Sequence, residues 1–169
     1  MIDIKDSPFW KHFLQGDGGP SEPVAAFAAH ADICGTYFAG IPEGRGDFRY
    51  APEKWSVKQV VGHLTDANLV FLYRLVCISR GEPKSLPGFD ENAYVDNARF
   101  DSQSWRHILE GYRAVALTTA TLIDGLDRTA WERMGAANDV RLTPQNMLWV
   151  LMGHERHHIR ILKERYGIA

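Results

Sequence analysis

Four long segments of this chain carry the spacing of apolar residues that is typical of amphipathic helices, and this pattern constrains the fold more than any other feature. Helix signals mark the segment ends. Ser56 and Gln59 form a capping box, Pro144 follows the N-cap candidate Thr143, and Gly81 is a stop signal. No strand-length alternating run is present. The expected helices cover residues 22–39, 56–81, 101–124 and 143–167.

These segments predict an all-α protein, a four-helix bundle with long crossover loops, in a single domain over residues 1–169. The connections 81–100 and 125–142 are long for simple hairpins, so the second and third helices could run parallel. A short extra helix is expected at residues 8–13. The glycine-rich stretch 16–19 is interpreted as a turn, because it lacks the strand and helix context of a phosphate-binding loop.

The composition is that of an ordinary globular chain. A net charge of −2 and a pI near 6.4 give no electrostatic reason to propose a nucleic-acid partner. The N-terminus lacks the apolar region of a signal peptide, and no uninterrupted apolar run is long enough to span a bilayer. Cys34 and Cys77 lie in apolar helical stretches and are expected to be reduced core residues. We therefore expect a cytoplasmic protein with no membrane partner.

Three of the seven histidines lie between positions 154 and 158. At helical spacing, His154 and His158 are one turn apart in an apolar stripe. Two buried imidazoles need partners for their ring nitrogens, and a metal ion provides one. His63 lies near the start of the second helix, and an antiparallel packing of the second and fourth helices would bring it to the same place. The sequence thus predicts a divalent-metal site formed by His63, His154 and His158.

Residues 154–158 also match the H-E-x-x-H pattern of zinc proteases, in which the glutamate is the general base. Such enzymes usually take the third metal ligand from downstream, where Glu164 would point to the far side of the helix from His158. No strand-like segment precedes the pattern to bind an extended peptide. A zinc protease is therefore kept as a minor alternative.

The other titratable residues are weaker candidates. Glu155 and Asp66 could orient a ligating histidine or move a proton, but both are interpreted first as solvated helix charges. His12, His30 and His107 have no partner spacing and are expected at the surface or the edge of the core. A further alternative is a non-catalytic metal-binding or stress-response bundle, in which a metal is structural or absent.

Two motifs resemble a known family. The stretch from Trp55 to Leu64 is similar to the W-S-x-x-x-x-x-x-H-L segment of the DinB/YfiT-like superfamily of metalloenzymes, and residues 153–162 are similar to its closing H-x-x-H-H motif. The match runs from about Trp55 to Tyr166 in the expected order, with Pro87–Asp90 in the middle loop. Together the motifs are fairly specific.

The resemblance implies an up-down-down-up four-helix bundle, often a homodimer. It also implies a divalent metal, typically zinc or nickel, held by three histidines that correspond to His63, His154 and His158. His157 matches a less certain family position, next to the ligands. Characterised relatives include thiol-dependent S-transferases and a glutathione- or mycothiol-dependent isomerase. The expected function is a metal-dependent transferase or hydrolase acting on a small molecule, with a low-molecular-weight thiol as a candidate partner.

Overall fold

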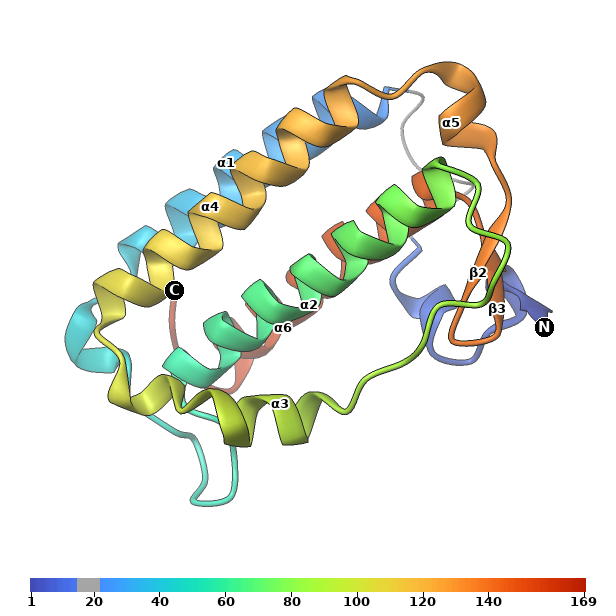
Figure 1. The fold of residues 1–169 in the computed structure, drawn as a ribbon. Helices are drawn as coiled ribbons and strands as arrows, with labels where there is room; N and C mark the ends of the chain where they lie inside the picture. The colour runs from blue at the N-terminus through green and yellow to red at the C-terminus, as the bar shows by residue number, and fades with distance from the viewer. Residues whose placement is uncertain (15–21) are drawn as a thin grey trace.

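A computed structural model describes residues 1–14 and 22–169, so the turn expected at residues 16–19 lies outside the described part. The expected all-α four-helix bundle is confirmed. In Figure 1, α1 and α4 lie side by side on one side of the bundle, and α2 and α6 on the other. The four long helices are α1 (Pro23–Gly40), α2 (Val57–Ser79), α4 (Trp105–Asp124) and α6 (Pro144–Glu164).

The directions of the four helices follow from one apolar cluster at one end of the bundle. It joins the end of α1, the starts of α2 and α4, and the end of α6, through residues that include Phe38, Val57, Trp105 and Leu162. Therefore α1 and α6 run one way, and α2 and α4 run the other way. This is the expected up-down-down-up order, with α2 parallel to α4 and antiparallel to α6 (Figure 1).

The helix ends are close to the predicted ones because the capping residues act as expected. Ser56 and Gln59 form both bonds of a capping box at the start of α2, and Thr143 forms another with Asn146 at the start of α6. The third long helix, α4, begins later than predicted, because Ser104 is its N-cap. Residues Phe100–Ser102, where that helix was expected to begin, form a separate 3-10 turn, η4.

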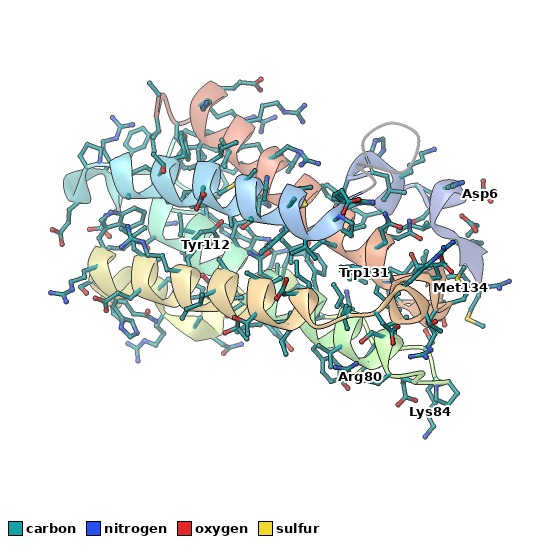
Figure 2. The ribbon with its side chains drawn as sticks, turned by 90° about the horizontal axis from the view of Figure 1, so that it is seen from above. Asp6, Arg80, Lys84, Tyr112, Trp131 and Met134 are labelled. Carbon is teal, nitrogen blue, oxygen red and sulfur yellow. The ribbon has the colours of Figure 1, made fainter. Side chains whose placement is uncertain are left out.

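The long connections contain additional short elements. The first holds α3 (Glu91–Ala98), and the second holds α5 (Arg128–Glu132) followed by a hairpin of β2 (Gly135–Ala137) and β3 (Val140–Leu142). Positive φ angles at Asn138 and Asp139 make the tight two-residue turn. These strands have only three residues, which is too short to show alternation, so the sequence contains no strand-length alternating run at this place. Figure 2 shows Trp131 and Met134 at the same end of the bundle as Arg80.

The N-terminal segment reaches from the hairpin to α6. Strand β1 (Ile2–Asp3) pairs in parallel with β3, and the 3-10 turns η1 (Ile4–Asp6) and η2 (Trp10–His12) follow. The expected helix at residues 8–13 is thus a single 3-10 turn. A third turn, η3 (Glu43–Arg45), lies between α1 and α2. The segment packs so tightly on α6 that a Cβ atom at Gly153 would lie 2.1 Å from the carbonyl oxygen of Phe13.

Helix α2 is long and apolar enough, by length and composition alone, to cross a membrane. It is not an uninterrupted apolar run, because Lys58, Asp66 and Arg74 lie within it. Most of the helix is nevertheless buried inside the bundle, where the central helix of a globular core needs the same apolar composition.

The close approach at Gly153 predicts opposite effects of two alanine substitutions. Gly153→Ala should lower the free energy of unfolding by about 1–3 kcal/mol, because the new methyl group displaces the backbone at Phe13. Gly35→Ala in α1 meets no atom within 4 Å and should raise the free energy of unfolding by about 0.5–1 kcal/mol through helix propensity. Urea denaturation of both variants checks this. Equal effects would contradict the described packing of the N-terminal segment.

Candidate metal centre

The three histidines expected to bind metal converge in the structure. His63 comes from α2, and His154 and His158 from successive turns of α6. The Nε2 atom of His154 lies 3.3 Å from Nε2 of His63 and 3.1 Å from Nε2 of His158. The antiparallel packing of α2 on α6 is what brings the start of one helix beside the later half of the other.

This arrangement fits a metal ion. Two nitrogens bound to one ion at about 2.0–2.1 Å in tetrahedral geometry are about 3.3 Å apart, close to the separations found here. The Nδ1 atoms of His63 and His154 are buried and have no hydrogen-bond partner among the described residues, so the Nε2 atoms carry the polar interactions of these rings. Three imidazole nitrogens directed at one point are suitable ligands for a divalent transition metal.

Burial keeps the three imidazoles uncharged. Loss of water lowers the pKa of His63 to about 4 and that of His158 to about 3. The pKa of the deeply buried His154 is also lowered, first by burial and then by the neighbouring His158 and His63. Metal binding requires the neutral ring, so protons do not compete with a metal at neutral pH.

The histidines form one wall of a cavity of about 470 Å³. Aromatic rings hold the imidazoles in place: Trp55 lies 4.8 Å from His63, and Phe13 and Phe71 lie 5.4 and 5.6 Å from His154, measured between ring centroids. Phe13 belongs to the N-terminal segment, and the connection after α2 contributes Gly88 and Phe89 to the cavity wall. The site therefore lies between α2, α6 and two non-helical segments, rather than in the centre of the four helices.

His157 and Asp66 occupy different positions. The half-buried ring of His157 lies 5.2 Å from that of His158 and lines the same cavity. Its pKa is lowered by burial and then by Arg160 and Arg165. Asp66 is half-buried, and burial raises the pKa of its carboxyl group. Asp66 is not among the residues that line the cavity.

Glu155 points away from this site into the centre of the bundle. Its carboxylate is only 2% exposed and accepts hydrogen bonds from His30 at 2.6 Å, Asn68 at 2.9 Å and the Tyr112 hydroxyl at 2.6 Å. These partners come from α1, α2 and α4, so one carboxylate joins all four long helices. Figure 2 shows Tyr112 in the layer between the helices.

Two expectations are corrected by this network. Glu155 is not a solvated helix charge, and His30 is not at the surface or core edge but is buried. Cys34 lies 3.3 Å from Nε2 of His30, and burial together with Glu155 raises the pKa of its thiol to about 12. Cys34 and Cys77 are free, as expected. His30, Cys34 and Glu155 are also close enough together to hold a metal ion.

The position of Glu155 argues against a zinc protease. A zinc protease needs the glutamate of the motif beside the metal, where it takes a proton from water. Here both oxygens of Glu155 are already bound by donors on the interior side of α6. The H-E-x-x-H pattern therefore describes two side chains that face different environments.

Sequence reasoning missed this network because it assigned one buried face to α6, whereas every residue from Met147 to Glu155 is buried. A signal was available in α1. Phe27, His30, Cys34 and Phe38 recur at helical spacing, and all four are buried. The spacing of Phe27 and Phe38 could have placed His30 on the inner face.

The network predicts a large loss of stability in Glu155→Ala. Removing the carboxylate leaves the buried donors of His30, Asn68 and Tyr112 without a partner, which should cost about 3–5 kcal/mol of unfolding free energy. Glu164→Ala, at an exposed position of the same helix, should change it by less than about 0.5 kcal/mol. Chemical denaturation measures both. A loss below 1 kcal/mol in Glu155→Ala would show that the carboxylate is solvated.

Comparisons with known proteins place the fold. Over 92% of this chain and 94% of the other, the structure matches YfiT from Bacillus subtilis, described as a probable metal-dependent hydrolase with an unusual four-helix bundle topology, at a TM-score of 0.75 and 19% identity. The mycothiol-dependent maleylpyruvate isomerase matches at 0.68 and 10% identity, and a histidine-to-alanine variant of it at 0.67 and 9%.

This chain is covered to 94% in both isomerase comparisons but spans 62% of the isomerase itself. At such identities these similarities show the fold alone. No curated protein matches the sequence. The sequence profile of the DinB superfamily, in contrast, matches residues 26–162, which include both histidine motifs. The chain therefore belongs to the DinB superfamily.

Proposed function

We propose that this protein is a metal-dependent enzyme that acts on a small molecule, either by transferring the sulfur of a thiol to an electrophile or by hydrolysis. In this proposal a divalent ion is held by the Nε2 atoms of His63, His154 and His158. The observation that carries it is the convergence of these three atoms, 3.1 and 3.3 Å apart, on the wall of a cavity large enough for a small molecule.

Three imidazoles leave coordination positions open, which is typical of catalytic rather than structural sites. A divalent ion held there would lower the pKa of a bound water or thiol and so supply a nucleophile near neutral pH. Imidazole ligands suit zinc and nickel equally well, and we propose one of these two metals.

The residues around the histidines support this chemistry. Trp55, Phe13 and Phe71 pack on the imidazoles and exclude water from one side of the site. His157 lines the same cavity, and burial followed by Arg160 and Arg165 lowers its pKa, which favours the uncharged ring that could accept a proton from a thiol or water. The substrate would enter between the N-terminal segment and the residues that follow α2.

The relatives support both reaction classes. One similar structure is described as a probable metal-dependent hydrolase, and another is a mycothiol-dependent enzyme. We therefore propose a metal-activated water or a low-molecular-weight thiol as the second reactant. The alternative is a bundle that binds metal without catalysing a reaction.

Metal content tests the ligand assignment. The protein should bind close to one zinc or nickel ion per chain. His63→Ala, His154→Ala and His158→Ala should each lower the affinity for the metal at least about tenfold, because each removes a direct ligand. His107→Ala, at an exposed position of α4, is the matched control and should keep full occupancy. Elemental analysis and competition with a chelator measure these effects, with circular dichroism to verify folding. Full occupancy in folded variants of all three positions would refute the site.

Reaction class requires a separate experiment. The metal-loaded protein should either join a small thiol to chlorodinitrobenzene, releasing chloride and a proton, or release nitrophenol from nitrophenyl acetate in the absence of thiol. Either activity should be lost in the metal-free protein and in His154→Ala, because both lack the activated nucleophile. Chromatographic identification of the products distinguishes the two reactions. Stoichiometric metal without turnover of a broad panel of thiols, electrophiles and esters would favour the non-catalytic alternative.

A further inference from the structure

A buried arginine shares the cavity with the three histidines. Arg74 of α2 is 3% exposed and lines the cavity that also contains His63 and His154. A cation taken out of water normally has a carboxylate partner, because desolvation is costly without one. Among the ion pairs formed by residues 1–14 and 22–169, none includes Arg74. Its charge is therefore uncompensated.

The surroundings of Arg74 fix its position but leave most of its donors free. One terminal nitrogen donates to the carbonyl oxygen of Pro87 at 2.6 Å, while the buried Nε has no partner among the described residues. The guanidinium carbon lies 5.7 Å from the ring centroid of Trp10, 5.9 Å from Phe71 and 6.0 Å from Phe89. Three aromatic rings partly replace the lost water, but they accept no strong hydrogen bond.

The charges in the cavity are complementary to an anion. Glu91 is the acidic residue in the described cavity wall, and it is exposed and forms no ion pair with Arg74. A divalent ion at the histidines would add further positive charge to the same cavity. A planar guanidinium with free donors matches the two oxygens of a carboxylate or phosphate.

The distance between the two positive positions limits the length of a ligand. His63 and Arg74 are three helical turns apart on α2, which separates their Cα atoms by about 16 Å. The ring of Phe71 lies 5.6 Å from the His154 ring and 5.9 Å from the Arg74 guanidinium, so the gap to His154 cannot exceed the sum of these distances. A molecule that bridges both groups therefore spans no more than about 11.5 Å.

We propose that Arg74 binds an oxyanion of the substrate or thiol, a carboxylate or phosphate several bonds from the group that meets the metal. This inference rests on the proposed function, because it assumes that the histidine site is where the small molecule reacts. It defines the substrate class as an elongated, anionic small molecule. Arg74 is a specificity residue that recognises the end of the molecule remote from the metal.

The test compares matched thiols that differ in charge. Thiolate binding to the cobalt-substituted protein is followed by its charge-transfer absorption, for 3-mercaptopropionate, 6-mercaptohexanoate and 8-mercaptooctanoate and the alcohols of the same lengths. The six- or eight-carbon acid should bind roughly tenfold to hundredfold more tightly than its alcohol. The three-carbon pair is the short reference, for which the smallest difference is expected.

Arg74→Met should remove the preference for the long acid and leave the affinity for the long alcohol unchanged, while Arg74→Lys should retain part of it. Arg45→Met is the matched control, because Arg45 also donates to a backbone carbonyl, of Tyr166, lies over the ring of Phe48 and has a buried, unpartnered Nε, but does not line this cavity. This control should keep the wild-type preference.

Each outcome separates the two proposals. Equal affinities for acid and alcohol at every length, or an equal loss of both in Arg74→Met, would reduce Arg74 to a structural clamp on Pro87 and overturn the inference. Uptake of cobalt without a thiolate band would contradict thiol chemistry at the histidines but not the role of Arg74. If cobalt gives no thiolate band, or if no cobalt is bound, the same acid and alcohol pairs are titrated into the metal-free protein by calorimetry. That experiment decides whether Arg74 selects the acid.

Discussion

The burial of α6 on all sides from Met147 to Glu155 is the constraint on which the rest of the structure depends. Helices α1 and α2 pack along α6, and the N-terminal segment covers it at Gly153, so its residues from Met147 to Glu155 are all removed from water. Consecutive positions on a helix point about 100° apart. The side chains of His154 and Glu155 therefore lie in two separate buried environments. Each environment must provide polar partners for a buried polar side chain.

The two environments solve this problem differently. On the interior side, the Glu155 carboxylate is saturated by donors from three other helices, which fixes the helices relative to one another. On the other side, His154 faces two further imidazoles and has no carboxylate or carbonyl partner within residues 1–14 and 22–169. A carboxylate whose oxygens are all hydrogen-bonded suits a structural role. A group of imidazole nitrogens with free lone pairs suits the binding of a ligand. Of these two adjacent residues in one motif, Glu155 thus contributes to stability and His154 to the proposed chemistry.

The parts of the structure that follow from local signals could be predicted from the sequence. The capping box at Ser56 and the N-cap Thr143 followed by Pro144 predicted the starts of α2 and α6, and the apolar spacing predicted the four helices. The convergence of His63 with His154 and His158 followed from antiparallel packing of those two helices. The family match confirms the superfamily, whereas the metal assignment itself stays a prediction.

The missed features depend on contacts between distant segments. The unpaired state of Arg74 is decided by which groups the folded chain places around its guanidinium, and Pro87 and Trp10 are far from it in sequence. The burial of His30 depends on Glu155 across the bundle. The short strands form because β1 reaches β3 from the other end of the sequence, and three-residue strands have no periodicity of their own. The spacing of apolar residues along a helix does not reveal such contacts between segments.

The contact between Phe13 and Gly153 has a consequence for the order of folding. Residues 1–14 form a two-residue strand and two 3-10 turns. They pack on β3 and α6, which are among the last elements along the chain. Closing so long a loop is entropically unfavourable until the helices have already assembled. The bundle should therefore form first, with the histidine cluster open to solvent, and the N-terminal wall should dock in a late step. A metal ion would then have access to its ligands before the cavity is complete.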